Sequence, residues 1–201
     1  KWDGKSRLVP KGEREILKQA SGSDADINAL TASALNSLGF IAEPVMIRRR
    51  SEGILLDFHA SINAYDTFIL KVTSPDGTKS WFLDAAREYG YLNVLSPDFL
   101  VAQARLLHLD GYGEWADLTN LSKQNRASEV VSASISPEGY LEGKVSVSAV
   151  GHASYSVKAD YDDYDTEDAF LEDLESDEGI QVRDFEIKRE YGPSATISYT
   201  F

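Results

Sequence analysis

The spacing of apolar residues changes along the chain, from a helical period in its first part to a period of two in its last part. Residues 24–38 carry apolar side chains at helical spacing, and Gly39 supplies a helix stop. These side chains are Ile27, Leu30, Ala34, Leu35 and Leu38. A shorter helix is predicted over residues 12–20, ended by Gly22. From residue 127 onward apolar and polar residues alternate, which is typical of half-buried strands.

Three runs between residues 40 and 86 favour strands. The run "FIAEPVMI" predicts a buried strand, and the polar "RRRSEG" behind it predicts a hairpin or loop. The runs "TFILKVT" and "SWFLDAA" flank "SPDG", whose Pro and Gly suit a tight turn, so a β-hairpin is expected over residues 67–85. Further on, "SPDFLVAQARLLH" predicts a helix over 96–108 with Pro97 at its first position, and residues 109–125 indicate a loop and linker.

Residues 126–201 predict a second, β-rich domain with one helix, at about 166–176. Its strands are expected in "EVVSASIS", "GYLEGKVSVSAVG", "HASYSVKAD", "IQVRDFEIKREY" and "ATISYTF". The predicted fold class is therefore α+β. Helices pack on an antiparallel sheet in residues 1–125, and a mostly antiparallel β domain follows in residues 126–201.

Charge is distributed unevenly between the two parts. The chain has a net charge of -13, and residues 1–125 carry 14 basic and 16 acidic side chains, whereas residues 126–201 carry 6 and 17. This asymmetry supports a domain boundary near residue 125. The acidic balance argues against nucleic acid as a partner, because that binding relies on Lys and Arg. No apolar run approaches the roughly 18 residues of a membrane span, so no membrane insertion is expected.

The residue types that are missing also limit the chemistry. The absence of cysteine excludes disulfides, thiol catalysis and cysteine-bound metal. No G-x-S-x-G elbow, phosphate-binding loop or dinucleotide fingerprint occurs, so no cofactor is expected. The sequence begins at Lys1 without a methionine, which leads us to expect a piece of a longer protein.

The stretch 160–178 contains eleven acidic side chains and no basic one. Clustered carboxylates suit calcium, but an EF-hand pattern started at Asp160 would place Leu171 at the bidentate position. We therefore favour a solvated amphipathic helix over a calcium site. Its side chains Phe170, Leu171 and Leu174 are expected to face the sheet.

The remaining candidate ligands are histidines and arginines. His59, His108 and His152 lack the spacing of metal ligands, so no metal site is expected. The arginines at 48–50 could grip an anionic ligand, but solvated side chains beside Glu52 are the commoner arrangement. They are kept only as a partner surface.

One stretch resembles a known family. "GSDADINALTASALNSLGFIAEPVMI" is similar, without a gap, to the helix that opens with a "GDCKDKA"-type motif in transglutaminase-like domains of the papain superfamily. "YDTFIL" looks like the family's histidine strand, and "WFLDAA" looks like its "WLDAT" strand. The opening "KWDG" resembles the approach to this core in bacterial multidomain members, where a further β-rich domain follows.

The resemblance implies a site without family chemistry. The nucleophile's place falls on Asp24, the base's on Thr67 and the orienting acid's on Asp84, so only the acid is retained. A shift of one residue would put Ala25 at the nucleophile. Because nucleophile and base act as a unit, their joint loss removes the activity. The expected function is a non-catalytic binding or scaffolding module of a larger extracytoplasmic bacterial protein, with a protein, peptide or glycan ligand or neighbouring domains as partners.

Two alternatives remain open from the sequence. Asp24 and Asp84 would form the acid–base pair of a hydrolase if their pKa values were split in one cleft. Alternatively, the fragment is a structural spacer in which Asp24 and Asp26 cap the helix, and Asp24→Ala costs about 1 kcal/mol. If Asp24, Thr67 and Asp84 converge in an open groove, that groove is a candidate binding site. A packed lid over them favours the spacer.

Overall fold

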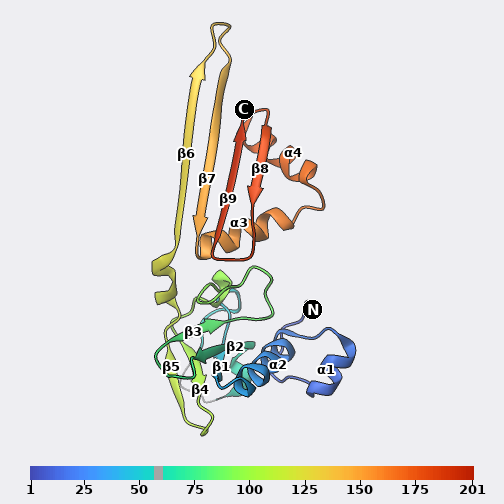
Figure 1. Cartoon of the computed structure of the whole chain (residues 1–201), viewed down its shortest axis with the longest axis vertical. Helices are drawn as coiled ribbons and strands as arrows, with labels where there is room; N and C mark the ends of the chain where they lie inside the picture. The colour runs from blue at the N-terminus through green and yellow to red at the C-terminus, as the bar shows by residue number, and fades with distance from the viewer. Residues whose placement is uncertain (57–60) are drawn as a thin grey trace. The chain divides into compact units, whose positions relative to one another are not determined.

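The structure, a computed structural model, describes residues 1–56 and 61–201 and separates into two compact units, Lys1–Lys123 and Gln124–Phe201 (Figure 1). The class is α+β, with helices and two antiparallel sheets, the second in a β-rich region. No helix in the described part of the chain is long and apolar enough to cross a membrane.

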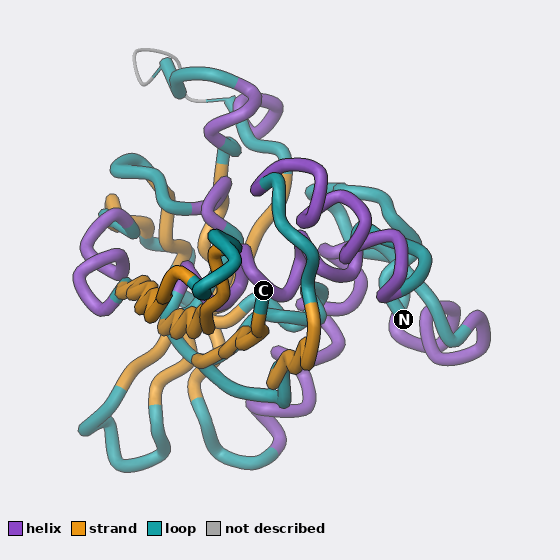
Figure 2. The backbone as a smooth tube through the Cα atoms, turned by 90° about the horizontal axis from the view of Figure 1, so that it is seen from above, coloured by secondary structure: helices purple, strands orange, loops and turns teal. Residues whose placement is uncertain are grey.

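The first unit contains a five-stranded antiparallel sheet in the order β3-β2-β1-β4-β5. Its helices are α1 (Glu13–Gln19) and α2 (Asp24–Ser37), and its strands are β1 (Ile41–Ile47), β2 (Thr67–Thr73), β3 (Ser80–Leu83), β4 (Ala104–Leu107) and β5 (Gly113–Ala116). Much of the unit is loop, and Figure 2 draws the loops and turns of the chain in teal. The predicted hairpin is confirmed, with Leu70 of β2 opposite Leu83 of β3.

Two clusters of buried apolar side chains enclose the middle strands of this sheet. One contains Val45, Ile47, Ile69, Leu95, Phe99, Ala104, Leu106 and Leu118. The other contains Ala25, Ala42, Met46, Phe68, Leu70 and Val72. Because β1 and β2 contribute to both clusters, their near-continuous apolar runs are buried on two faces. Thr67, the polar first residue of β2, therefore lies in the protein interior.

Helix α2 turns a different face to the sheet from the predicted one. Ala25 is fully buried, and Ala29, Ala32 and Leu35 pack against its cluster, whereas Leu38 is exposed. Alanine has a short side chain, so the helix backbone can lie close to the strands. This close packing lets polar side chains in the first turns of α2 reach the ends of the strands.

The helix predicted over residues 96–108 is wrong. A short 3-10 helix at Pro97–Phe99 is followed by β4, where Leu106 lies opposite Val45 of β1. Ala104 and Leu106 are buried while their neighbours in β4 are half-buried, so the burial has a period of two. The run joins the sheet because pairing with β1 buries these alternate side chains, which outweighs helix propensity.

Two smaller predictions in the first unit also need correction. The segment 109–125 is not only loop and linker, since it contains β5, which pairs with β4, and a 3-10 helix at Thr119–Gln124. Helix α1 ends at Ala20, whose φ of 53° is left-handed, rather than at Gly22. Alanine does not ordinarily mark the end of a helix, and a strand of four residues is too short to give a clear pattern of alternation.

The second unit is a four-stranded antiparallel sheet in the order β6-β7-β9-β8 with two helices. Its elements are β6 (Arg126–Ile135), β7 (Leu141–Val150), α3 (His152–Asp162), α4 (Glu167–Glu178), β8 (Arg183–Lys188) and β9 (Ser194–Thr200). Side chains alternate between two faces. Val145, Ala149, Ala195 and Tyr199 are buried on one face, and serine and threonine dominate the other.

The prediction of a single helix in this unit is wrong, because "HASYSVKAD" forms α3 instead of a strand. Gly151, with a φ of 68°, follows β7 and precedes the helix. Lys158 donates to the carbonyl oxygens of Glu190 and Gly192, at 2.9 and 2.8 Å. These partners are more than 30 residues away, so alternating apolar residues alone could not reveal the helix.

Candidate functional site

The structure brings the three predicted site residues together. Asp24 is the first residue of α2, Thr67 the first of β2, and Asp84 directly follows β3. Antiparallel pairing sets the end of β3 beside the first half of β2, and the start of α2 packs over the same place. Asp24 and Thr67 are fully buried and Asp84 is 2% exposed. The residues converge in a closed interior position and not in an open groove, which is the outcome that favours the structural spacer.

Asp24 accepts hydrogen bonds from three directions. The Thr67 hydroxyl donates to Oδ2 at 2.7 Å. The backbone N–H groups of Arg7 and Ala25 donate to Oδ1, both at 2.8 Å. A carboxylate with this many donors is well satisfied without water.

Arg87 joins the two carboxylates. Its Nη2 lies 4.0 Å from Asp24 Oδ2, and its Nε lies 3.5 Å from Asp84 Oδ2. Neither Arg87 Nε nor Asp84 Oδ2 has a hydrogen-bond partner in the described part of the chain. Charge attraction therefore holds this pair more than directed hydrogen bonding does.

Asn28 connects the helix to both strands that carry the site. Its Nδ2 donates to the carbonyl oxygen of Phe68 at 3.0 Å and to Asp84 Oδ1 at 2.9 Å. Its Oδ1 accepts from the N–H of Ala85 at 2.8 Å. Asn28 and Asp24 are four residues apart, so they share one face of α2.

Asp84 sits where its ionised form is disfavoured. Burial raises the pKa of Asp84, and the negative charge of Asp24 acts in the same direction. Hydrogen bonds from Asn28 and Ala86 and the charge of Arg87 oppose this shift without cancelling it. Asp84 and Asp24 therefore occupy different electrostatic environments.

The start of α2 is closed by a reciprocal capping box, which corrects the expectation that Asp24 is a cap. Ser23 is the N-cap, and its hydroxyl accepts from the N–H of Asp26 at 3.2 Å while Asp26 Oδ2 accepts from the N–H of Ser23 at 2.9 Å. A Cβ at Gly22 would lie 2.7 Å from the Cβ of Asp26. Glycine is thus required for this close approach.

Acid should weaken the contribution of Asp26 to stability. Burial alone would raise the pKa of Asp26, but N–H groups of Lys11 and Ser23 more than offset it, so the pKa lies below its ordinary 3.8. The ionised carboxylate therefore stabilises the fold above that value, and this stabilisation is lost as the pH falls through the folded-state pKa. Asp26→Asn should be most destabilising near neutral pH and approach wild type in acid.

The paired control is Asp84→Asn, for which the expected change of stability with pH is opposite to that of Asp26→Asn. Since the folded-state pKa of Asp84 is raised, its carboxyl costs stability as the pH rises through that pKa. As the pH rises through that pKa, Asp84→Asn should therefore become more stable relative to wild type. Urea unfolding measured from neutral to acidic pH compares the two variants. If the stability difference between variant and wild type changed with pH in the same direction for both variants, the opposite pKa shifts of Asp26 and Asp84 would be contradicted.

The N-terminal segment covers this site. Trp2 forms a bridge with Gly22, and its ring lies 3.9 Å from the guanidinium of Arg87. The N–H of Asp24 donates to the carbonyl oxygen of Lys5 at 3.2 Å. A cation on an indole face is attracted by the ring, so Trp2 holds Arg87 over the two carboxylates. A substrate could reach Asp24 only if this segment moved.

The other predicted ligand residues do not gather into a metal site. Within residues 1–56 and 61–201, no group of His, Asp and Glu side chains is placed to hold a metal ion. His59 lies outside the described residues. His108 Nδ1 is 3.0 Å from Glu43 Oε1, and burial lowers the pKa of His152. In α4, Phe170 packs on Tyr161 and Phe185, as expected of an amphipathic helix.

The arginines at 48–50 have separate roles. Arg49 pairs with Glu52 and Asp66, at 3.4 and 4.0 Å. Arg48 and Arg50 border a pocket of about 370 Å³ with an apolar lining from Ile54, Leu55, Leu100 and Val101. Two cations beside an apolar surface suit an anionic group with an apolar part.

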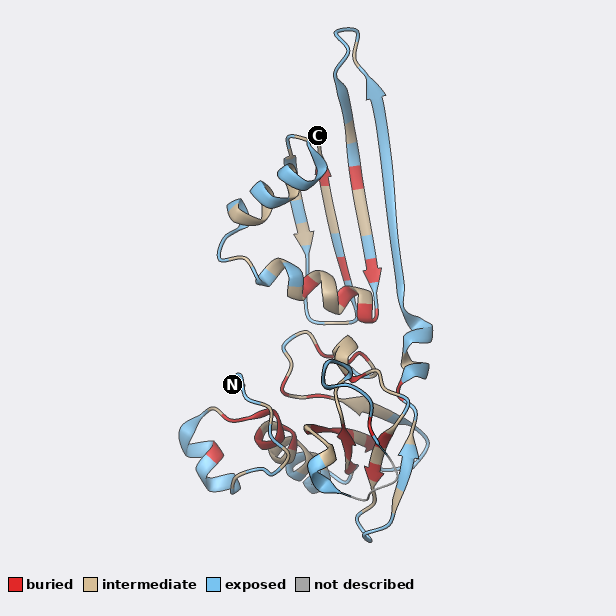
Figure 3. Ribbon diagram, turned by 180° about the vertical axis from the view of Figure 1, so that it is seen from behind, coloured by how far each residue is buried: buried red, intermediate tan, exposed pale blue. Residues whose placement is uncertain are grey.

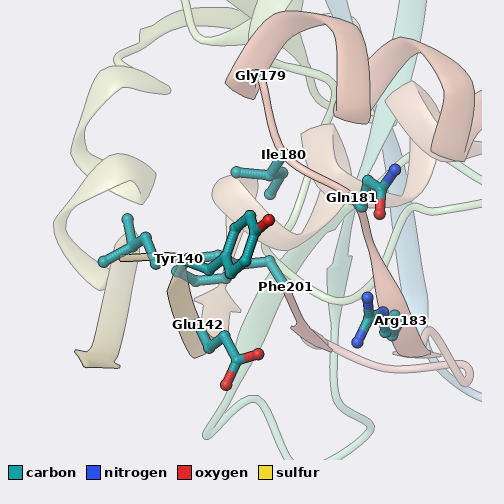
Figure 4. Close-up of a pocket in the computed structure, with 8 residues that line it drawn as sticks. Tyr140, Glu142, Gly179, Ile180, Gln181, Arg183 and Phe201 are labelled. Carbon is teal, nitrogen blue, oxygen red and sulfur yellow. The ribbon is translucent and has the colours of Figure 1, made fainter. Parts of the chain in front are cut away.

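A second pocket, of about 520 Å³, lies at the hairpin end of the second sheet (Figure 4). Tyr140, Ile180 and Phe201 supply apolar surface, and Glu142, Gln181 and Arg183 supply polar groups. The ring of Phe201 lies against Gly143, where a Cβ would come within 2.7 Å of it. Glycine at this position therefore lets the ring fold over the strand.

Comparison with known protein families, curated proteins and solved structures finds no match for this chain. Reasoning from the sequence missed Trp2, Asn28 and Arg87. Asn28 carried a usable signal, because it lies one helical turn after Asp24. Trp2 carried none, since only the folded chain brings it to Arg87.

Proposed function

We propose that the first unit is a non-catalytic transglutaminase-like domain, followed by the family's β-rich domain, and that the chain is a scaffolding or binding module of a longer extracytoplasmic bacterial protein. The observation that carries this proposal is the enclosure of Asp24. The position that the resemblance assigns to the nucleophile holds a carboxylate whose oxygens accept hydrogen bonds from Thr67, Arg7 and Ala25. A nucleophile needs an exposed, activated atom, and this arrangement supplies none.

The order of elements supports the same proposal. Asp24 lies at a helix start, and one strand, β1, comes before β2, which carries Thr67, and β3, which Asp84 directly follows; this is the order that the resemblance implies. Arg87 and Asn28 now fill the space between them. The site therefore acts as a polar support that fixes α2 to β2 and β3, which is the structural role that the spacer alternative gives it. Because the site is closed, a peptide or glycan ligand would bind elsewhere, for instance in either pocket.

A carboxylate hydrolase is the second candidate, and the raised pKa of Asp84 beside Asp24 favours it. Against it stand the burial of both carboxylates and their existing partners. General acid–base catalysis needs a substrate within hydrogen-bonding distance. A hydrolase would therefore require displacement of residues 1–7.

The two candidates are separated by assaying the whole chain for transamidation and for peptide and glycoside hydrolysis. We expect no turnover above that of the Asp24→Asn variant, purified in parallel. Turnover by wild type that disappears in Asp24→Asn and in Asp84→Asn would overturn the proposal in favour of the hydrolase. Transamidation gained by the double variant Asp24→Cys with Thr67→His would support the resemblance itself.

A further inference from the structure

Strand β6 forms an open edge of the sheet in the second unit. The sheet order places it beside β7 alone, and all of its residues, Arg126–Ile135, are exposed (Figure 3). Val130, Val131 and Ile135 are 65%, 55% and 75% exposed. A ten-residue edge with apolar side chains is a template for pairing with another strand.

The register shows which backbone groups point away from the sheet. Gly143 of β7 exchanges both backbone hydrogen bonds with Phe201, so its groups face β9. Ala133 lies opposite Gly143 and therefore turns its own N–H and C=O toward the open edge. The alternation repeats every second residue. The outward residues are Ala127, Glu129, Val131, Ala133 and Ile135.

The two edges of this sheet are protected to different degrees. The far edge, β8, has a register shift between Arg183 and Glu186 and a left-handed residue at Asp184, with a φ of 50°. Bulges and charges of this kind discourage edge pairing. Strand β6 runs in unbroken register with β7 and contains no proline and only two charged residues, Arg126 and Glu129. Only the β6 edge is therefore suited to pairing.

We propose that β6 pairs antiparallel with β6 of a second copy, with Val131 opposite the partner's Val131, to make one continuous sheet. A two-fold axis at the middle of the strand gives this antiparallel arrangement. Among symmetric registers, this one uses every outward residue. It sets Glu129 opposite the partner's Ala133, whereas a register centred on Glu129 would oppose two carboxylates, which is unfavourable.

The acidic charge of the unit does not prevent this pairing. Most of it lies in residues 160–178, and Phe170 of that stretch packs on Phe185 of β8, at the sheet edge opposite β6. Three strand spacings, roughly 14 Å, separate β8 from β6. Glu178 acts on Tyr199 of β9, a strand that lies two spacings, roughly 10 Å, from β6. Both separations exceed the Debye length of about 8 Å at physiological salt. The dimer should become tighter as salt screens the remaining repulsion.

Sedimentation equilibrium of the whole chain tests the proposal, with Val131→Pro as the disrupting variant. Proline removes only an outward N–H at this position, so the ladder with β7 is kept. Wild type should dimerise, and Val131→Pro should raise the dissociation constant by about tenfold or more. Val131→Ala, which keeps the N–H, should stay dimeric. A monomeric wild type, or a Val131→Pro variant that dimerises as wild type does, would overturn the proposal.

Single cysteines test the register directly, since the chain has none of its own. At the two-fold axis, Val131→Cys places two Cα atoms about 5.5 Å apart, within disulfide range. Ile135→Cys, at a more exposed position, would be about 27 Å from its copy. Mild oxidation should cross-link Val131→Cys and leave Ile135→Cys monomeric on a non-reducing gel. Equal cross-linking would show random collision and refute the register.

Discussion

Replacing Asp24 with alanine is expected to destabilise the first unit by about 4 kcal/mol, the usual cost of breaking a buried ion pair from one side. The substitution removes the acceptor for Thr67 and for the N–H of Arg7, and leaves Arg87 with one carboxylate in place of two. Because Thr67 and Asp84 are buried and Arg87 is half-buried, water cannot fully replace the partner that they lose.

Urea unfolding followed by tryptophan fluorescence measures this loss of stability in the first unit. The three tryptophans, Trp2, Trp81 and Trp115, all lie in the first unit. The matched control is Asp24→Asn, which keeps the shape and an acceptor but removes the charge, and should cost about 2 kcal/mol. A loss of only about 1 kcal/mol for alanine would equal that of an ordinary cap and would show that the network is not a structural support.

Replacing Asn28 with alanine is expected to cost about 3 kcal/mol, because it removes three hydrogen bonds at once from groups that are buried or half-buried. The carbonyl of Phe68, the N–H of Ala85 and Oδ1 of Asp84 each lose a hydrogen bond of 3.0 Å or less. These groups belong to β2 and to the segment after β3. The substitution therefore loosens the attachment of α2 to both.

Asn36→Ala, near the other end of the same helix, is the control. Asn36 accepts from the N–H of Ala42 at 2.8 Å but is exposed, so water can take its place. We expect its loss to cost about 1 kcal/mol or less. The same fluorescence measurement applies to both variants. Similar losses for Asn28 and Asn36 would contradict a special role for the buried asparagine.

Reasoning from the sequence placed the local elements of the site well. The Gly22 turn before α2 and the turn between β2 and β3 act within a few residues. Their outcome was therefore predictable, and so was the position of Asp84 at the end of a strand. The interpretation of Asp24 as a cap was wrong because Ser23 and Asp26 complete the cap without it.

Elements whose identity depends on distant partners were mispredicted. The run "AQARLL" favours a helix by itself, yet β4 forms because β1 lies beside it. Residues 152–162 alternate like a strand, yet they form α3, where Lys158 finds acceptors in Glu190 and Gly192. In both cases a contact distant in sequence outweighed the local preference.

The sequence by itself determined the change of period along the chain, the helix start at residue 24, the β2–β3 hairpin and the lack of thiol chemistry. These features depend on local backbone preferences and on the residue types present. Only the tertiary structure decided that Asp24, Thr67 and Asp84 are buried together and that Trp2 and Arg87 cover them. Burial and pairing depend on which distant segments meet, and the free energy of a carboxylate depends on those neighbours far more than on its own position in the chain.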